Sequence, residues 1–467
     1  MIRIFSHYIP TKILLLFFLE TAILISAVYL GGSLRFAGDQ AGFSDALAPI
    51  WPKSLVFTSL ILLAMSAVGL YHGDFREGLR GILLQLVLAF LLGAGIMSLV
   101  FYLVPSLYLG RGVFGLAFLI AFLGLLLTRA ILFKWTNLGT FKPRILVLGT
   151  GTRAGDVEKG AQSNLHAGNI DIVGYLPLLA TQHDVCSSRI LPAQGSILSV
   201  AKHYGVHEIV IAVRDRRGGG LPVHELLECK LSGVKITELS TFFERERGQV
   251  QLDSLNTSWM VFGEGFRQGM LKDVVKRVFD LVASSILLVA TLPIMLITAL
   301  AILIEDEDGH PVLYRQERVG QGGQIFTIYK FRSMRHDAEK DGSPRWAKAD
   351  DDRTTKVGRI IRKLRIDELP QIINVFKGEM SFVGPRPERP YFVDKLAAQI
   401  PYFAARHSIK PGITGWAQVR YTYGASLADA VEKLQYDLYY VKNHTLFLDI
   451  MILLETIRVV LWGKGAR

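Results

Sequence analysis

The sequence predicts a chain of three parts: an α-helical membrane bundle of four spans, an α/β domain with a parallel sheet, and a mainly α-helical monotopic domain with a re-entrant membrane helix. Three observations predict this order. Four long apolar stretches fill the first third of the 467 residues, a glycine-rich turn follows a buried strand in the middle, and a fifth apolar stretch leads into a basic C-terminal part. We place the parts at residues 1–138, 139–265 and 271–467.

The composition excludes several classes of protein. Half of the residues are hydrophobic and 20% are charged, whereas soluble domains carry about 25% charged residues. A disordered chain is excluded, because such chains have too little apolar surface to bury. Two cysteines cannot make a disulfide framework, and free thiols are typical of a reducing compartment.

Four apolar stretches have the length of membrane spans, which need roughly 17–25 residues. They cover residues 13–30, 54–70, 81–104 and 112–128. Glu20 is a charge inside the first stretch; we favour pairing with another helix over a functional role. Basic residues precede the first span and follow the fourth, so the positive-inside rule places both ends of the bundle in the cytoplasm.

The middle part begins with the buried strand RILVL, residues 144–148, which runs into the pattern Gly149-x-Gly151-x-x-Ala154. Further strands are predicted at 170–175, 208–213 and 234–238. This pattern is typical of a Rossmann-like, CoA-binding-like domain with a parallel sheet. Its glycines bind a nucleotide in one interpretation and only make the tight turn in the other. We favour the turn, because no acidic residue that could bind a ribose follows the second strand.

A fifth apolar stretch opens with KRVFD, residues 276–280, and continues to residue 304. Its length allows a fifth span. Pro293 near its middle removes a backbone hydrogen bond and bends a helix. A full span would also carry the remaining residues away from cytoplasmic nucleotides. We therefore predict a re-entrant helix over residues 276–304, broken at Pro293, that returns to the same membrane face.

The C-terminal part concentrates basic residues beside two adjacent carboxylates. Residues 271–467 hold 29 basic and 23 acidic residues, and residues 353–365 hold six basic residues and no acid. Asp367 and Glu368 follow directly. Arginines bind phosphate oxygens, while carboxylates bind Mg²⁺ or act as nucleophiles. The pattern indicates phosphoryl or nucleotide-sugar chemistry at a membrane, although the pair taken alone would favour a solvated helix start.

Five motifs in order resemble those of the bacterial sugar transferases, the monotopic phosphoglycosyl transferases or polyprenyl glycosylphosphotransferases. They are residues 276–280 (KRVFD), 329–334 (YKFRSM), 367–371 (DELPQ), 384–387 (GPRP) and 411–416 (PGITGW). The four spans and the Rossmann-like part resemble the long members that start exopolysaccharide chains. The closing residues 424–467 resemble the exosortase-associated subgroup.

The resemblance implies transfer of a sugar-1-phosphate from a UDP-sugar to undecaprenyl phosphate, with release of UMP and a covalent phosphosugar-Asp intermediate. Asp367 would be the nucleophile and a ligand of Mg²⁺, and Glu368 the acid/base or metal-orienting partner. The resemblance also implies that Arg362 and Arg386 bind phosphates. Lys330, Arg332 and Lys410 are further candidates for substrate or phosphate binding, and Lys410 has a surface role as an equal alternative.

The same resemblance implies a multi-pass protein of the bacterial inner membrane whose active site faces the cytoplasm and contacts membrane lipid. Glucose-1-phosphate is the group that we expect to be transferred, with galactose-1-phosphate as the alternative. The resemblance leaves open whether the protein forms a homo-oligomer. Nucleic acid is not an expected partner, because the basic residues cluster around Asp367 and suit a UDP-sugar and a lipid phosphate better.

Three positions depart from the family's pattern. Leu292 stands directly before Pro293, where Ser is common, and Thr291 lies one residue earlier. Arg365 stands two residues before Asp367 in place of a frequent Ser. After Gln418 the chain reads Val419-Arg420-Tyr421, where the family commonly has Asn-Gly-Arg. The consequences of these departures for the break and for donor contacts are open.

Two other functions compete with the transferase. A membrane nucleotide-sugar dehydratase or epimerase using NAD would need a Tyr-x-x-x-Lys pair in the Rossmann-like part, but the match, Tyr391 with Lys395, lies in the C-terminal part. A non-enzymatic scaffold or sensor would leave the C-terminal motifs unexplained. We therefore favour the transferase.

Overall fold

The computed structural model describes residues 2–4, 7–39, 43, 47–71, 78–137, 142–162, 170–178, 184–192, 195–213, 221–252, 266, 269–306, 309–335, 353–421, 424 and 426–462. The chain divides into two compact units. The N-terminal unit comprises Met1–Ile2 with Ile9–Arg247, and the C-terminal unit comprises Arg3–Tyr8 with Gly248–Arg467. Two short strands, β1 (Ile2–Ile4) and β2 (His7–Ile9), pair ahead of the first helix.

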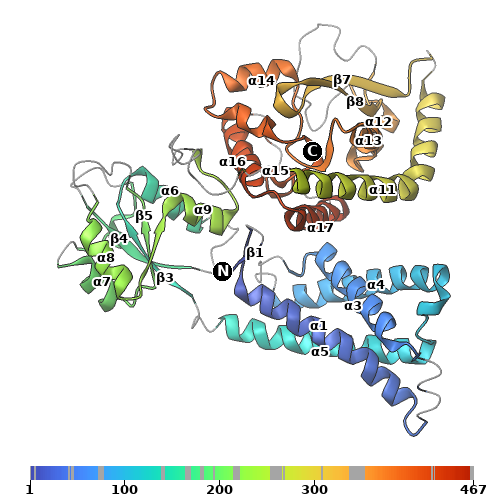
Figure 1. Ribbon diagram of the computed structural model, residues 1–467, viewed down its shortest axis with the longest axis horizontal. Coiled ribbons are helices and arrows are strands. Elements are labelled where there is room, and N and C mark those ends of the chain that lie inside the picture. Colours follow the sequence, from blue (N-terminus) through green and yellow to red (C-terminus); the bar gives the residue numbers. More distant parts are fainter. Residues whose placement is uncertain are drawn as a thin grey trace. The chain divides into compact units, whose positions relative to one another are not determined.

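Long apolar helices form the first part of the N-terminal unit (Figure 1). They are α1 (Thr11–Arg35), α3 (Ile50–Val68), α4 (Gly78–Leu103) and α5 (Arg111–Asn137), with the 3-10 turn η2 (Pro105–Leu107) between the last two. Within the described ranges, five helices are long and apolar enough to cross a membrane, and four of them lie here. Phe57, Phe90 and Ala117 are buried between the helices, while Leu84 and Leu91 stay exposed. An apolar outer surface is what lipid-facing helices require.

Glu20 of α1 is buried against Arg129 of α5. Arg129 Nε lies 2.7 Å from Glu20 Oε1, and Arg129 Nη2 donates to Oε2 over 3.0 Å. Tyr71 donates to the same carboxylate over 2.6 Å, and Arg129 Nη1 donates to the Leu70 carbonyl over 2.9 Å. Glu20 is therefore paired with a neighbouring helix, as predicted, and the pair fixes α1 against α5.

The second part of the N-terminal unit is a four-stranded parallel sheet in the order β4-β3-β5-β6. The strands are β3 (Arg144–Leu148), β4 (Asp171–Leu176), β5 (Glu208–Ile211) and β6 (Lys235–Glu238). The helices are α6 (Thr152–Gln162), η3 (Ser187–Arg189), α7 (Ile197–His203), α8 (Val223–Leu231) and α9 (Leu239–Arg247). Ile145 packs in the core with α6 and α9, while Leu146 packs in the core with α7 and α8. The predicted α/β domain is present, with its first strand as predicted.

The glycine-rich turn after β3 uses its own hydrogen-bonding groups. Gly149 adopts a φ of 115°, which favours glycine. Its N–H donates to the Leu176 carbonyl over 2.8 Å, and the Asp184 N–H donates to the Thr150 carbonyl over 2.9 Å. A Cβ at Gly149 would lie 3.2 Å from the Ala212 carbonyl oxygen. Gly149 thus serves the turn, and its amide is already satisfied within the domain.

Helices predominate in the C-terminal unit, with two small sheets among them (Figure 1). The strands are β7 (Leu313–Val319), β8 (Ile325–Phe331), β9 (Ser381–Val383) and β10 (Gly412–Thr414). The helices are α11 (Met270–Glu305), α12 (Lys356–Lys363), α13 (Ile372–Lys377), α14 (Pro390–Ala397), α15 (Trp416–Arg420), α16 (Leu427–Asn443) and α17 (Leu446–Trp462), and the 3-10 segments are η5 (Gln321–Gly323), η6 (Ile366–Gln371) and η7 (Phe403–Ser408). β7 and β8 form an antiparallel hairpin, and β9 pairs parallel with β10.

Helix α11 is 36 residues long and contains Pro293. At 1.5 Å per residue a straight helix of this length would measure about 54 Å, well beyond the roughly 30 Å hydrocarbon core of a bilayer. Figure 1 shows α11 bending sharply between its two ends. Thr291 Oγ1 donates to the Leu287 carbonyl over 2.7 Å, so a hydroxyl contacts the helix backbone just before the proline.

Candidate active site

The two adjacent carboxylates lie at the start of η6, directly after α12. Thr355 caps α12 by accepting from the Gly358 N–H over 2.9 Å, and the helix ends at Lys363, with Leu364 as its C-cap. Arg365 then takes a left-handed conformation with φ 56°, which turns the chain into η6. Asp367 and Glu368 occupy the first turn of η6. This turn brings both carboxylates next to the basic end of α12.

Glu368 is the ion-paired member of the dyad. Its Oε1 accepts from Lys330 Nζ over 3.1 Å and from Arg386 Nη2 over 2.8 Å. Arg365 Nη1 lies 4.0 Å from Oε2. Burial alone would raise the pKa of Glu368, but Arg386 and Lys330 outweigh it and hold that pKa well below its usual range. Glu368 is therefore ionised at neutral pH.

Asp367 behaves in the opposite way. Burial, and next the charge of Glu368, raise the pKa of Asp367 above its ordinary value, although nearby cations oppose the shift. Among the described residues none donates a hydrogen bond to the Asp367 carboxylate, in contrast to Glu368. Two neighbouring acids whose environments push their pKa values apart are suited to different roles. Asp367 is the more basic carboxylate, and within the described residues no hydrogen bond holds its oxygens.

Arg362 and Lys330 bring positive charge to Asp367 from opposite directions in the sequence. Arg362 lies in the last turn of α12, and its charge favours ionised Asp367. Its Nη1 is buried and has no hydrogen-bond acceptor in the described part of the chain. Lys330 comes from β8, whose backbone is tied to α13 because the Tyr329 N–H donates to Asn374 Oδ1 over 3.2 Å. A phosphate oxygen would satisfy the Arg362 donor.

Arg386 reaches the dyad from the segment after β9. Its side chain contacts Glu368, and its carbonyl accepts from Arg406 Nη2 over 2.9 Å. Arg406 also pairs with the buried Asp437 at 2.8 Å. Sequence reasoning missed Arg406 and Asp437, because nothing in the sequence links an arginine in η7 to an aspartate in α16. Arg318 of β7 was missed too, and its buried Nε has no acceptor within the described ranges.

The other predicted phosphate-binding residues lie in different surroundings. Arg332 Nη2 lies 3.0 Å from Asp306, just beyond α11, and no contact joins it to either dyad carboxylate among the described residues. Lys410 lines an open hollow of about 590 Å³ at the start of α11, together with Arg277 and Asp273. Thus Lys330, Arg362 and Arg386 converge on the dyad, whereas Arg332 joins the end of α11 to the strand β8.

The structure also shows the surroundings of the three residues that depart from the family's sequence pattern. Leu292 is 47% exposed on α11, and Thr291 supplies a hydroxyl to the backbone one position earlier than the common Ser. Arg365 contributes a third cation near Glu368. Arg420 pairs with Glu455 at 3.0 Å and lies over the ring of Trp416, 4.4 Å from its centroid. An ion pair and a cation–π contact thus hold Arg420 in place.

The donor set suits a magnesium ion. No cluster of three or more His, Cys, Asp or Glu side chains occurs in the described segments. Mg²⁺ does not need one, because it usually takes one or two carboxylates and completes its shell with substrate phosphates and water. The oxygens of Asp367, next to the ionised Glu368, meet that requirement.

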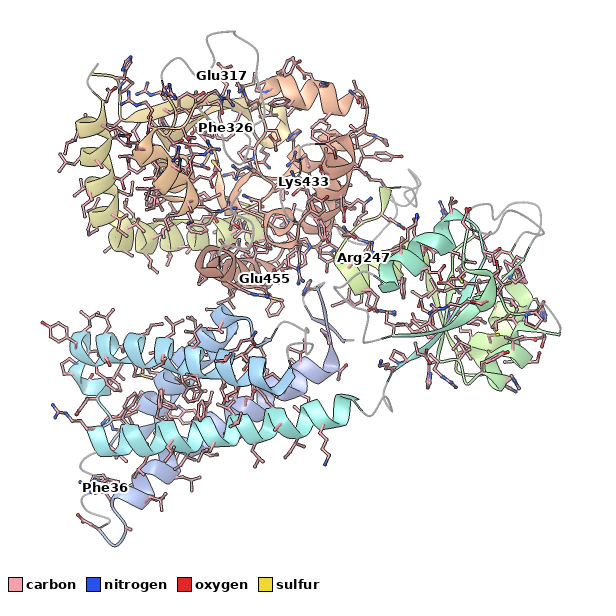
Figure 2. All side chains as sticks on the ribbon, turned by 180° about the vertical axis from the view of Figure 1, so that it is seen from behind. Phe36, Arg247, Glu317, Phe326, Lys433 and Glu455 are labelled. Carbon is pink, nitrogen blue, oxygen red and sulfur yellow. The ribbon has the colours of Figure 1, made fainter. Side chains whose placement is uncertain are left out.

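The charge distribution of the C-terminal unit is visible in Figure 2, where nitrogen atoms are frequent among its side chains and rare in the membrane bundle. The arrangement combines a carboxylate whose pKa is raised, an ionised partner and, within the described residues, buried donors of Arg362 and Arg318 that have no acceptor. It suits an anionic, phosphate-bearing substrate, because guanidinium groups bind phosphate oxygens bidentately.

Comparison with known proteins agrees with this chemistry. The sequence model of the family described as bacterial sugar transferase matches residues 271–463. The chain is 41% identical over 259 residues to the UDP-N-acetylgalactosamine-undecaprenyl-phosphate N-acetylgalactosaminephosphotransferase of Aeromonas hydrophila, covering 56% of this chain and 60% of that protein. It thus spans less than two thirds of that relative's length.

Two further relatives are matched over most of their length. One is the UDP-glucose:undecaprenyl-phosphate glucose-1-phosphate transferase of Caulobacter vibrioides, 42% identical over 198 residues, covering 42% of this chain and 72% of that protein. The other is the undecaprenyl-phosphate galactose phosphotransferase of Salmonella typhimurium, 30% identical over 368 residues, covering 73% and 72% of the two chains.

Proposed function

Because this chain belongs to the bacterial sugar transferase family, we propose that it transfers a sugar-1-phosphate from a UDP-sugar to undecaprenyl phosphate, releases UMP and so starts an exopolysaccharide repeat unit. The observation that carries the proposal is the dyad itself. Asp367 has a raised pKa and lies beside a Glu368 that Lys330 and Arg386 hold ionised. The names of the relatives supply the donor and acceptor classes.

In the first displacement a carboxylate oxygen of Asp367 attacks the sugar-bearing phosphorus of the UDP-sugar. The bond between that phosphorus and the bridging oxygen breaks, and UMP leaves with the bond's electron pair. A phosphosugar-Asp367 acyl phosphate remains. The raised pKa of Asp367 indicates a carboxylate that is poorly solvated and therefore more reactive.

In the second displacement an oxygen of undecaprenyl phosphate attacks the same phosphorus. The bond to the Asp367 oxygen breaks, which restores the carboxylate and gives the diphosphate-linked lipid. Dividing the transfer in this way lets one site serve a water-soluble donor and a lipid acceptor in turn. The kinetics are then of the ping-pong type.

Glu368 has the role of an organiser. Ionised and bound to two cations, it keeps Lys330 and Arg386 beside the position of the transferring phosphoryl group. Arg362, whose buried Nη1 has no acceptor in the described part of the chain, binds a phosphate oxygen of the donor. Mg²⁺ bound at Asp367 would neutralise charge on the diphosphate.

The membrane path of α11 is part of the proposal. A helix that enters and returns at Pro293 leaves Met270 and Glu305 on the same face, and the dyad with them. The basic flanks of α1 and α5 support a cytoplasmic position for both ends of the bundle. The active site then faces the cytoplasm at the inner membrane, where a UDP-sugar and the lipid phosphate can meet.

The assay uses the full chain in nanodiscs containing undecaprenyl phosphate, with Mg²⁺ and a panel of UDP-sugars. We expect UMP release, fastest with UDP-glucose, and its loss in Asp367→Asn. UDP-galactose and UDP-N-acetylgalactosamine are the alternative donors, because the relatives' names specify them. With labelled donor and no acceptor, wild-type protein should retain hydroxylamine-sensitive label. Label retained equally by Asp367→Asn would exclude Asp367 as the nucleophile.

A further inference from the structure

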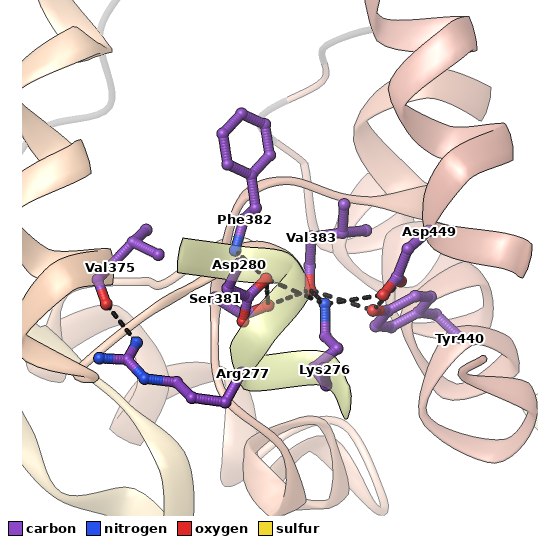
Figure 3. A network of polar contacts seen from close by, with 9 residues as sticks. All are labelled: Lys276, Arg277, Asp280, Val375, Ser381, Phe382, Val383, Tyr440 and Asp449. Carbon is purple, nitrogen blue, oxygen red and sulfur yellow. Dashed lines mark hydrogen bonds and ion pairs between the residues drawn. The ribbon is translucent and has the colours of Figure 1, made fainter. Parts of the chain in front are cut away.

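A buried polar network joins the first turns of α11 to the strand β9 (Figure 3). Asp280 is 2% exposed, and its Oδ1 accepts from Ser381 Oγ over 2.9 Å and from the Phe382 N–H over 3.0 Å. Lys276, one helical turn earlier, donates to the Val383 carbonyl over 3.1 Å. Two side chains of α11 thus bind three consecutive residues of β9.

The Val383 carbonyl is the centre of this network. It accepts from Lys276 Nζ and from Tyr440 over 3.0 Å, and it also lies 3.0 Å from Ser381 Oγ, whose one proton goes to Asp280 in this arrangement. Tyr440 also lies 2.6 Å from Asp449, and Asp449 lies 2.8 Å from Lys276. Helices α16 and α17 therefore hold the same carbonyl that α11 holds.

The protons can be arranged so that every group is satisfied. Tyr440 has one proton and two oxygen neighbours, Val383 and Asp449. If Asp449 carries a proton, it donates to Tyr440, and Tyr440 donates to Val383. Burial raises the pKa of Asp449 and supports this arrangement, although Lys276 opposes it. Lys276 and Asp280 then form a neutral pair.

The strand held in this way leads directly to Arg386. Gly384 donates its N–H to the Thr414 carbonyl over 2.9 Å, and the Pro385 carbonyl accepts from the Gly412 N–H over 3.0 Å. A Cβ at Gly384 would lie 2.4 Å from the Lys410 carbonyl oxygen, so the segment is closely packed. The backbone between β9 and Arg386 has little room to shift without moving the guanidinium.

We propose that Asp280 is a positioning residue that holds Arg386 on Glu368 by clamping β9 to the membrane helix α11. Removing its carboxylate leaves the Phe382 N–H without its buried acceptor, which is costly, and takes one partner from Ser381 Oγ and from Lys276. The segment can then relax only by moving toward other partners or water. Asp280 contacts no dyad carboxylate in the described structure, so its effect on the reaction passes through Arg386. This inference rests on the proposed transferase function for its kinetic test.

The kinetic test is a double-mutant cycle with the full chain in nanodiscs. Asp280→Ala is expected to lower kcat/KM for UMP release about tenfold, because a shift of the β9 backbone couples Asp280 to Arg386. In an Arg386→Ala background the same change should lower it less than about twofold. Asp280→Asn keeps the Oδ1 acceptor and should restore most of the activity. If the fold-losses in kcat/KM of Asp280→Ala and Arg386→Ala multiply fully in the double variant, the proposal is overturned.

A second readout needs no activity. Hydrogen exchange is measured on peptides covering residues 383–390, which exclude the Phe382 amide bound directly by Asp280. Faster exchange at Gly384 and Arg386 in Asp280→Ala supports the proposal, and exchange equal to wild type refutes it. Asp394→Ala, an exposed aspartate on α14, is the matched control. If no UDP-sugar yields UMP, the proposed function fails while this measurement still decides the role of Asp280.

Tyr440→Phe serves if Asp280→Ala does not fold. It removes one donor from the Val383 carbonyl and leaves Asp280 and Arg386 in place. The clamp predicts faster exchange at Gly384 in this variant as well, with a smaller effect than Asp280→Ala, because Lys276 still holds the carbonyl. Unchanged exchange at Gly384 in a folded Tyr440→Phe protein would contradict the clamp.

Discussion

Arg386 Nη2 lies 2.8 Å from Glu368 Oε1, although the two residues are 18 positions apart in the sequence. The pair joins the segment after β9 to the start of η6. It also fixes the ionised state of Glu368, since Arg386 is the strongest of the charges that lower its pKa. Much of the electrostatics of the dyad depends on this contact.

Arg386→Ala should therefore lower kcat/KM for UMP release by about 100-fold, the range found when one preorganised donor is removed from an active site. Glu368 would keep Lys330 but lose its shortest ion pair. Lys395→Ala is the matched control, because Lys395 is an exposed cation on α14. Equal activity of Arg386→Ala and Lys395→Ala would contradict the role of Arg386.

Asp367→Asn should stabilise the protein while removing the activity. The pKa of Asp367 is raised from 3.8 to about 6 in the folded state, so its protonated form favours folding. That contribution is fully present below pH 4 and is lost as pH rises through about 6. In EDTA, the melting temperature of Asp367→Asn should exceed that of wild type at pH 8, and the difference should shrink towards pH 4. A lower melting temperature at pH 8 would count against the raised pKa.

The rate should depend on the ionisation of Asp367. Because the carboxylate is the attacking form, kcat/KM should rise with pH as Asp367 ionises, with a midpoint at or below its metal-free pKa of about 6, because bound Mg²⁺ favours the ionised form. Glu368→Gln removes a charge that raises this pKa and releases two cations, so the midpoint should move to lower pH. Single-turnover measurements across the pH range provide the test. A midpoint that stays in place or moves upward would show that another group controls the rate.

Arg362→Ala and Arg332→Ala should have different consequences. Arg362 has a buried donor without an acceptor in the described structure, so its loss should raise KM for the UDP-sugar about tenfold or more. Arg332 is paired with Asp306, so its loss should lower the melting temperature and change KM little. Steady-state kinetics and thermal denaturation of both variants distinguish these outcomes. A raised KM in Arg332→Ala, with only a lower melting temperature in Arg362→Ala, would contradict the positions of the two arginines relative to the dyad.

Glu20→Ala should destabilise the membrane bundle. It leaves Arg129 buried without its carboxylate, and breaking a buried pair typically costs about 3–5 kcal/mol. The double variant Glu20→Leu with Arg129→Leu removes both charges and should recover much of the loss. Thermal denaturation in detergent compares the three proteins. A double variant less stable than Glu20→Ala would mean that the charges contribute more than mutual neutralisation.

Much of the fold follows from local pattern. The sequence predicts α1, α3, α4 and α5 from their apolar length and the first strand of the sheet from the residues RILVL. Each of these patterns lies within a short stretch of the chain. The strand β4 begins one residue later than predicted, at Asp171, since strand ends depend on pairing with β3. The short strands β9 and β10 were not predicted, because three-residue strands leave no periodic pattern.

The candidate site was predictable in its residue types and less so in its partners. Asp367 and Glu368 are adjacent in the chain, so no folding is needed to bring them together. Arg332 carries the same charge as Lys330 two residues away, yet it pairs with Asp306 while Lys330 reaches Glu368. In a continuous strand, residues 330 and 332 would lie on the same face, because side chains alternate between the two faces. Residue 332 lies just after the end of β8, so its side chain does not follow this alternation.

The sequence by itself determined the membrane helices, the α/β domain and the adjacent carboxylates, because apolar length, strand pattern and adjacency are properties of the chain. Only the tertiary structure decided which carboxylate is poised. Asp367 and Glu368 have the same charge and neighbouring positions, but Lys330 and Arg386 come within hydrogen-bond reach of Glu368 alone. Electrostatic energy depends on burial and on distances in space, and both are set by elements far apart in the sequence.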